Sequence, residues 1–520
     1  MRSTLAARSR VAGGPLVAAI SSRELPVSPA ALRSLVVIAV AAQSLSALAS
    51  LGCAPISPAS HVLESHHASG QSGAASSNGA SDGKSRRRVI VLSIDGLMPQ
   101  AYTEAEARGL DVPTLRMLRD KGAFSPGATS VFPSVTYPAH TTIATGVNPG
   151  AHRITTNLAW DPLGKNHEGW FWYAEDIAVP TLWQIAEKAG ATTALITWPV
   201  TVGARVDYCI PEYWRAGTAD DTKLMKALST PGLIDRISSR FPSYLEKLTP
   251  PDIPDSVAID AAVYLLETDP PDLMFVHVWD ADTAQHDHGP WSPQARARIE
   301  VADRQTARLL EAIDRNGVAD ETVLIVLSDH GFTSYSRRVR PGVILAGMNL
   351  VTPSKKNQGQ LEDWRAAVVT SGGTAYIYVK DDSDQQTRDA LVARFTELAK
   401  APESGVAAVY DREQIRARGG DPRAFLALAA SDGYAFSNGY HGDLVQRLGG
   451  DASSGADVLG HHGYDPALPE MNASLLIYGP AVKPGEITGA RLLDVAPTAA
   501  RWLGLTLDGA EGTALDVFSR

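Results

Sequence analysis

Three aspartates and three histidines in four short segments have side chains that can bind divalent cations. They are Asp95 in VIVLSIDG, Asp282 and His286 in DADTAQHDHGP, Asp329 and His330 in VLIVLSDHG, and His462 in GHHGYD. Six such ligands suffice for two divalent ions with coordination positions left open, and Zn²⁺ suits a mixed set of imidazoles and carboxylates. If the four segments meet in the fold, the residues predict a hydrolase with a two-metal site.

Such a hydrolase also needs a nucleophile, and the segment FPSVTYPAHTTIATG offers Thr136. This threonine lies between Pro133 and Pro138 and ahead of a predicted helix, so its hydroxyl is expected near a helix amino terminus, where anions bind. A divalent ion can lower the pKa of such a hydroxyl and make it nucleophilic. Each residue taken alone has a structural alternative to a catalytic role. A lone threonine here is more often an N-cap, and an Asp at a strand end commonly caps a helix. A single His commonly packs in the core or faces solvent. The joint presence of all seven residues favours catalysis.

The elements that must position these residues alternate along the chain from residue 86 onward. Apolar runs rich in Val, Ile and Leu predict buried strands, and amphipathic stretches predict helices. The strands are predicted at 89–94, 192–200, 273–280 and 322–329, and the helices at 112–121, 179–190, 256–268 and 296–317. This alternation predicts an α/β fold with a mostly parallel sheet and helices on both faces. The aspartates are then expected at the carboxyl ends of neighbouring strands, where such sheets place their chemistry.

The chain divides by composition into four parts. Arg33 precedes an apolar run that ends at Cys53, which is typical of a lipoprotein export signal; ordinary cleavage nearby and an uncleaved anchor are the alternatives. All three place the protein outside the cytoplasm, in the periplasm or cell envelope, with membrane attachment through a lipidated Cys53 in the first case. The predicted parts are the export segment 1–53, a flexible Ser/Gly/Ala-rich linker 54–85, a catalytic core 86–332 and 456–520, and an inserted subdomain 333–455 beside the active site.

The charge of the chain limits which kinds of molecule it is expected to bind. The chain has 520 residues, a net charge of −10 and a pI near 5.7, which argues against duplex nucleic acid and leaves room for a small phosphate ester held by metal ions. Cys209 is the one cysteine beyond Cys53, and we expect it to be a buried, inert thiol rather than part of a disulfide framework.

The motifs SIDG, TYPAHTTIATGVNPGAHRI, DxxxHxxGP, SDHG and HHGYD occur in the order seen in a known family. Over 86–334 and 455–520 the chain resembles the nucleotide pyrophosphatase/phosphodiesterase family of the alkaline phosphatase superfamily. The resemblance implies an alkaline-phosphatase-like core. It also implies hydrolysis of phosphodiester or phosphoanhydride bonds through a phospho-threonine on Thr136.

The resemblance also assigns roles to individual residues. It implies one zinc held by Asp282, His286 and His462, and a second held by Asp95, Asp329, His330 and the oxygen of Thr136. It makes Asn157 the amide that contacts the phosphoryl group, with Tyr137 and Trp198 as further substrate-binding candidates. Tyr137 could stack a nucleobase or only wall the cleft, and Trp198 could line the leaving-group side or only close the core. His461 fits the family pattern less well and is left out, and Ala139 replaces an asparagine usual in the family.

The residues just after the predicted strand at 192–200 bear on the charge of the substrate. Related monoesterases and phosphonate hydrolases place a pair of cationic side chains near the phosphoryl group, and TVGARVDY offers only Arg205. A singly charged diester does not demand that pair, so the sequence favours a phosphodiesterase. A phosphonate or phosphomonoester hydrolase is the alternative. A metal-stabilised surface scaffold is the nonenzymatic alternative, and it is disfavoured because a scaffold has no need of Thr136.

Overall fold

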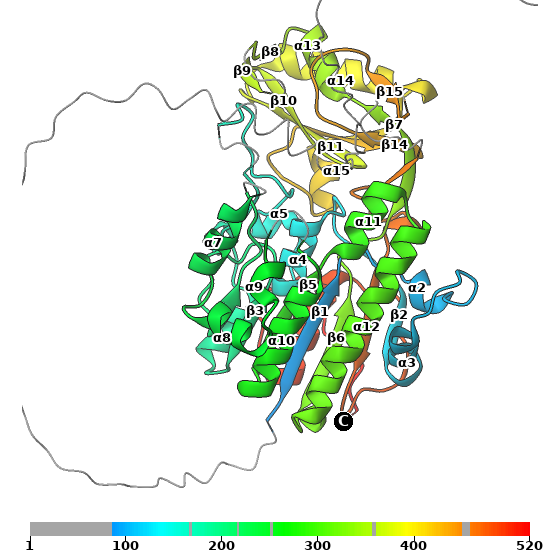
Figure 1. The fold of residues 1–520 in the computed structure, drawn as a ribbon. Helices are drawn as coiled ribbons and strands as arrows, with labels where there is room; N and C mark the ends of the chain where they lie inside the picture. The colour runs from blue at the N-terminus through cyan, green and yellow to red at the C-terminus, as the bar shows by residue number, and fades with distance from the viewer. Residues whose placement is uncertain are drawn as a thin grey trace, which may run out of the picture. The chain divides into compact units, whose positions relative to one another are not determined.

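A computed structural model of the chain describes residues 86–165, 169–215, 218–249, 253–355, 360–449 and 458–519 (Figure 1). The predicted export segment 1–53, with Cys53, and the predicted linker 54–85 lie outside these residues. In the part of the chain that is described, no helix has both the length and the apolar character needed to cross a bilayer.

An eight-stranded sheet lies at the centre of the fold, with β1 (Arg88–Ile94) inside it. β1 pairs in parallel with β5 (Leu273–Val278) on one side and with β6 (Thr322–Leu327) on the other, so three of the predicted strands are direct neighbours. The order across the sheet is β18 (Gly485–Glu486), β2 (Ala123–Ala128), β17 (Ala473–Tyr478), β6, β1, β5, β3 (Thr193–Ile196) and β4 (Tyr208–Ile210). Only β17 runs antiparallel to its neighbours, which confirms the mostly parallel sheet.

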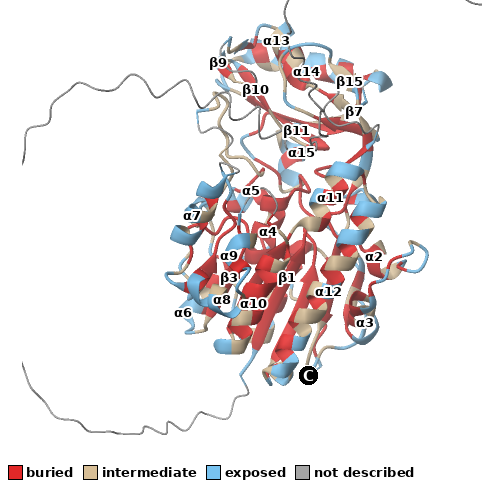
Figure 2. Ribbon diagram, in the orientation of Figure 1, coloured by how far each residue is buried: buried red, intermediate tan, exposed pale blue. Residues whose placement is uncertain are grey.

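Helices cover both faces of this sheet because its strands are apolar on both sides. In β1, Ile90 and Leu92 face one helical layer and Val89 and Val91 face the other, as the alternation of a strand requires. The first layer contains α3 (Pro113–Lys121), α8 (Leu233–Arg240), α10 (Ser256–Thr268) and α12 (Pro293–Arg315), and the second α4 (Thr136–Thr145), α6 (Leu182–Lys188) and α16 (Val495–Leu503). Figure 2 shows the central strands buried along their length.

Further helices lie in the connections. They are α2 (Gln100–Thr103), α5 (Pro149–His152), α7 (Ala219–Leu228), α9 (Tyr244–Lys247) and α11 (Asp280–His288). The predicted strand at 273–280 is therefore shorter than expected, since the chain becomes helical at Asp280. Cys209 is a buried free thiol, as expected.

The segment 333–455 carries an apolar core of its own and lies beyond the carboxyl ends of the central strands in Figure 1. Its main sheet has the order β10 (Ala366–Ser371), β11 (Thr374–Val379), β13 (Leu426–Ala430) and β12 (Val406–Tyr410), all antiparallel. A smaller sheet joins β14 (Gly433–Phe436), β7 (Thr333–Val339), β15 (Val445–Arg447) and, just beyond the segment, β16 (Leu459–His461). The remaining elements are α13 (Pro341–Gly347), α14 (Gln385–Leu398), α15 (Arg412–Ala417) and a hairpin of β8 (Val351–Pro353) and β9 (Leu361–Trp364).

Candidate active site

The carboxyl ends of the central strands bring the predicted ligands together. Asp95 directly follows β1, and Asp329 follows β6 after one residue. Asp282 differs from the prediction, because it lies in the first turn of α11 and not at a strand end. This helix begins two residues after β5, and it places Asp282 and His286 four residues apart on one helical face. The helical position therefore lets one segment supply two converging ligands.

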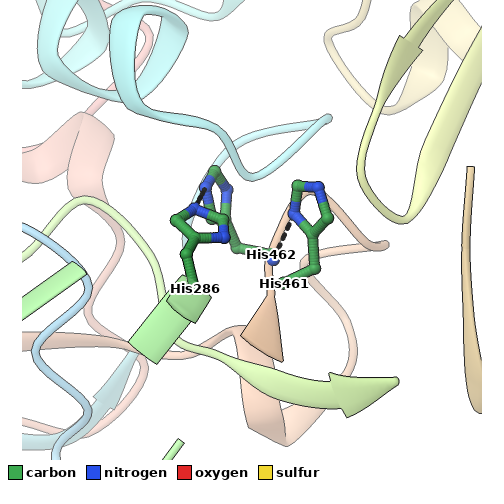
Figure 3. A group of neighbouring side chains, drawn as sticks. All are labelled: His286, His461 and His462. Atoms are coloured by element: carbon green, nitrogen blue, oxygen red, sulfur yellow. Dashed lines mark hydrogen bonds between the residues drawn. The ribbon is translucent and has the colours of Figure 1, made fainter. Parts of the chain in front are cut away.

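The first predicted set, Asp282, His286 and His462, converges (Figure 3 shows the two histidines). The Nε2 atoms of His286 and His462 are 3.1 Å apart, and they lie 3.5 and 3.8 Å from Oδ1 of Asp282. Nδ1 of His286 lies 3.1 Å from the carbonyl of Gly460, and Nδ1 of His462 lies 3.0 Å from the carbonyl of Ser134. Each carbonyl favours the tautomer protonated at Nδ1, which leaves the Nε2 lone pairs directed at the cluster, as in metal-ligating histidines.

The second predicted set surrounds His330. Its Nε2 lies 3.1 Å from Oδ2 of Asp329, 3.4 Å from Oδ1 of Asp95 and 3.5 Å from the hydroxyl oxygen of Thr136. The imidazoles of His330 and His462 stack with ring centroids 3.6 Å apart, so the two sets adjoin. The structure thus brings together all seven residues whose side chains the sequence assigned to two cations and a nucleophile.

Three buried oxygen atoms test whether these residues suit cations. Oδ1 of Asp95, Oδ1 of Asp282 and Oδ2 of Asp329 are buried and accept no hydrogen bond, although an imidazole Nε2 lies 3.1–3.5 Å from each. A buried carboxylate oxygen without a partner is strongly unfavourable unless a cation compensates it. All three atoms belong to the two converging sets, and the donors are imidazole and carboxylate. The arrangement therefore fits divalent cations of the zinc type.

The protonation equilibria of the cluster show the same excess of negative charge. Burial, together with the charges of Asp329 and Asp282, raises the pKa of Asp95 well above its usual value, and burial raises the pKa of Asp282. Burial alone would lower the pKa of His330, but the carboxylate of Asp329 raises it to about 9. Burial and the charge of His330 hold the pKa of His462 well below its usual value, which keeps this imidazole neutral and able to bind a metal.

Thr136 is the first residue of α4, as the sequence predicted. The positive end of the helix dipole therefore lies at the hydroxyl, where it favours an anionic phosphoryl group. Oδ1 of Asn157 accepts the backbone N–H of Tyr137 at 2.9 Å, which fixes the orientation of that amide. The Nδ2 group of Asn157 remains available as a donor beside Thr136, and both residues line the same cavity.

This cavity has a volume of about 450 Å³ and opens beside both ligand sets. It is lined by Asp95, Thr136, Asn157, Trp170, Glu212, Trp214, Ile253, His277, Trp279, Asp282, Thr283, His286 and His462. None of these described lining residues is Lys or Arg, and three of them are tryptophans. The cavity therefore suits a substrate of low negative charge with an aromatic or apolar group.

Tyr137 and Trp198, the further substrate-binding candidates, occupy the other position considered for each, in the cavity wall and in the core. Trp198 is fully buried against Phe275 and His140, and it does not line the cavity. The left-handed backbone at Thr197, with φ of 51°, interrupts the strand alternation just before this indole. Tyr137 is also fully buried, with its ring behind Trp170 at 5.1 Å between centroids, so it supports the cavity wall without facing the substrate.

The structure adds residues that the sequence did not single out. Nε2 of His277, on β5, lies 3.1 Å from Oδ2 of Asp95, and its Nδ1 lies 3.1 Å from Oε2 of Glu212. A histidine inside an apolar strand was a visible signal for His277, whereas Glu212 lies in a segment with no motif. His461, which the sequence left out, adjoins the cluster: its ring centroid lies 4.9 Å from that of His286, and these two residues and His462 form one group that could hold a metal ion, although Nδ1 of His461 accepts the backbone N–H of His462 (Figure 3).

A mostly parallel α/β sheet that gathers Asp, His and a helix-terminal Thr at its carboxyl edge defines a protein of the alkaline phosphatase type. Residues 89–465 match the family model of type I phosphodiesterase / nucleotide pyrophosphatase, and the chain belongs to this family.

Relatives and solved structures agree with this assignment. An uncharacterized pyrophosphatase/phosphodiesterase of Schizosaccharomyces pombe is 29% identical over 258 residues, which are 48% of this chain and 45% of that protein. A bis(5'-adenosyl)-triphosphatase of Bos taurus is 23% identical over 84% of this chain and 82% of its own. The fold is similar, with a TM-score of 0.57 and 21% identity, to an inactive threonine-to-alanine variant of murine ectonucleotide pyrophosphatase/phosphodiesterase 5 in complex with AMP. That match covers 82% of this chain and 97% of the murine one.

Proposed function

We propose that the chain is a two-zinc phosphodiesterase/nucleotide pyrophosphatase that acts through a covalent phospho-threonine on Thr136. The observation that carries this proposal is the position of the Thr136 hydroxyl. It lies at the amino terminus of α4, 3.5 Å from Nε2 of His330, where the two sets of ligands meet. His330 also lies beside two of the buried carboxylate oxygens that accept no hydrogen bond, Oδ1 of Asp95 and Oδ2 of Asp329, so the hydroxyl adjoins a cluster that suits cations.

Each set of ligands would hold one zinc ion. Asp282, His286 and His462 would bind the first, and Asp95, Asp329 and His330 the second. When bound, such ions act as Lewis acids on a phosphoryl oxygen and lower the pKa of a neighbouring hydroxyl. His277 and the carbonyls that accept the Nδ1–H groups of the histidines orient the ligands from behind.

Thr136 and Asn157 have separate roles in the proposed reaction. Thr136 loses its hydroxyl proton to water and bonds to phosphorus, while the bond to the leaving oxygen breaks and that oxygen takes a proton from water. Asn157 donates from Nδ2 to the nonbridging oxygen on which charge develops. Water then attacks the phospho-threonine, which releases the phosphate product and restores the Thr136 hydroxyl.

The substrate that this cavity favours is a singly charged diester or an anhydride with an aromatic leaving group. The described lining carries no cationic side chain to match a doubly charged monoester, and Trp170, Trp214 and Trp279 offer indole surfaces. Arg205, the one cation the sequence offered in this region, is exposed and does not line the cavity. The nucleotide activity in the name of the bovine relative and the AMP in the murine complex support a nucleotide substrate.

Substitution of Thr136 tests the proposal. Thr136→Ala is expected to abolish hydrolysis of bis-(p-nitrophenyl) phosphate, while Thr136→Ser retains part of it and a phospho-residue is found by mass spectrometry after quenching. Thr145→Ala is the matched control, because Thr145 lies at the far end of the same helix and its hydroxyl bonds only to backbone groups, the carbonyl of Thr141 and the N–H of Val147. Full activity in Thr136→Ala would end the proposal. Elemental analysis of the purified protein tests for two zinc ions, and a faster rate on a monoester would reverse the predicted preference.

We also propose that the chain is exported to the periplasm or cell envelope, with a lipid on Cys53. The support is the apolar run between Arg33 and Cys53, followed by a segment of linker composition. Cell fractionation of the wild type and of Cys53→Ala tests this. Release of the variant, but not of the wild type, from the membrane fraction is the expected result, and equal distribution of both would refute lipidation.

A further inference from the structure

A loop of the core that carries Asn157 is held from the segment 333–455 on both sides of this residue. Two residues before it, the hydroxyl of Thr155 donates to Oδ2 of Asp421 at 3.0 Å. Three residues after it, Trp160 packs on Tyr378, with ring centroids 4.1 Å apart. Asn157 thus lies within a short span, residues 155–160, whose two ends are attached to the segment 333–455.

Asp421 is the centre of these attachments and is fully buried. Besides Thr155, its Oδ2 accepts the hydroxyl of Tyr378 at 2.8 Å, and both carboxylate oxygens bond to the guanidinium of Arg423. Tyr378 therefore contacts both the carboxylate and Trp160, which joins the two attachments into one unit. A buried charge with every oxygen bonded fixes its partners firmly, and the loss of one partner would disturb the others.

The backbone carries this restraint onward to the catalytic groups. The N–H of Phe171 donates to the carbonyl of Asn157 at 3.1 Å, and Leu158 forms an isolated β-bridge with Trp170, so the span also positions the cavity-lining Trp170. The side chain of Asn157 in turn holds the first turn of α4 through the N–H of Tyr137. A shift of this span would move the Nδ2 donor relative to the Thr136 hydroxyl.

We infer that Asp421 is a positioning residue, through which the inserted segment holds the Asn157 amide in place for transition-state stabilisation. The inference rests on the proposed function of Asn157 as the oxyanion donor, and it gives the segment 333–455 a role in the chemical step. Asp421 touches neither the cavity nor the ligand sets and acts only through Thr155 and the neighbouring span.

A double-mutant cycle in kcat tests the inference. Asp421→Ala is expected to lower kcat for bis-(p-nitrophenyl) phosphate about tenfold with little change in KM, because a donor that moves by a fraction of an ångström acts less well in the transition state. In the Asn157→Ala background the same substitution is expected to have no further effect on kcat. Asp421→Asn, which still offers an acceptor to Thr155, is expected to recover most of the rate.

Asp303→Ala is the matched control, because Asp303 is an equally buried carboxylate that caps α3 through the N–H groups of Thr114 and Leu115. It is expected to lower the melting temperature without lowering kcat. If Asp421→Ala does not fold, Thr155→Val removes the hydroxyl that donates to Asp421 and accepts from Arg423, and the same cycle is measured with it. An equal loss of kcat in the presence and absence of Asn157, or no loss at all, overturns the inference.

Hydrogen exchange separates a failure of this inference from a failure of the proposed function. In Asp421→Ala, but not in Asp303→Ala, the amides of residues 154–160 are expected to exchange faster. Faster exchange in a protein whose Thr136→Ala variant is as active as the wild type would leave the positioning intact and refute the function. Unchanged exchange would refute the positioning itself.

Discussion

Replacement of Asn157 by two different residues distinguishes its catalytic role from a structural one. Its Oδ1 is committed to the N–H of Tyr137, and only its Nδ2 can serve the substrate. One donor to a developing oxyanion contributes about 3 kcal/mol, so Asn157→Ala is expected to lower kcat about 10²-fold. Asn157→Asp keeps an acceptor for Tyr137 but replaces the donor with a negative charge beside an anionic phosphoryl group. We therefore expect a loss larger by about a further tenfold or more.

The assay is the initial rate on bis-(p-nitrophenyl) phosphate at several substrate concentrations, with zinc content and melting temperature measured for each variant. KM is expected to change little, because the donor acts mainly in the transition state. Asn316→Ala is the matched control, since the amide of Asn316 bonds to Ala312 at the end of α12, away from the cavity. Wild-type activity in Asn157→Asp would refute the reasoning, since it would show that the acceptor alone matters.

Three further outcomes are expected. Chelation of divalent ions should abolish hydrolysis and lower the melting temperature by several degrees, because the buried carboxylate oxygens would lose the cations that compensate their charge. Addition of Zn²⁺ should restore both activity and melting temperature. An unchanged melting curve would contradict the metal site. Burial and the charge of Asp280 raise the pKa of Asp255 to about 7, so the folded state retains a proton that the unfolded chain loses near pH 4. Stability should then fall by roughly 2–4 kcal/mol as the pH rises from 4 to 8, and urea denaturation should show a flatter profile for Asp255→Asn. Trp214→Ala should raise KM about tenfold for diesters with aromatic leaving groups but not for dimethyl phosphate, because Trp214 lines the cavity. Trp198→Ala should instead lower the melting temperature, because Trp198 is fully buried. A raised KM in Trp198→Ala and a lowered melting temperature in Trp214→Ala would place Trp198 in the cavity.

The central sheet and the convergence of the candidate ligands were predictable because their signals are local. Asp95 and Asp329 each follow an apolar run, and parallel strands bring their carboxyl ends to one edge whatever the loops do. Asp282 and His286 were identified by their spacing, although their helix was not foreseen. The spacing of four residues suits a helix. The preceding apolar run, however, led to a strand predicted as far as residue 280, where the helix already begins.

The contacts of the cavity wall were not predictable in the same way. The sequence left Trp198 open between the leaving-group side and the core, because the left-handed backbone at Thr197 is a tertiary outcome that no local pattern predicts. Glu212 and Asp421 depend on partners far away in the sequence, and neither lies in a motif. Buried carboxylates of this kind are recognised only when the groups that compensate them are known.

The pairing of β16 with β7 has a consequence for how the protein matures. The whole inserted segment separates His330 from His462 in sequence, and the ladder between Leu459–His461 and Thr333–Tyr335 closes that loop. His462 directly follows β16, so this ladder brings it to the other candidate ligands. A chain in which β16 is not paired with β7 therefore presents an incomplete set of these side chains. If they bind cations as proposed, metal binding and the docking of β16 are thermodynamically linked, and each promotes the other.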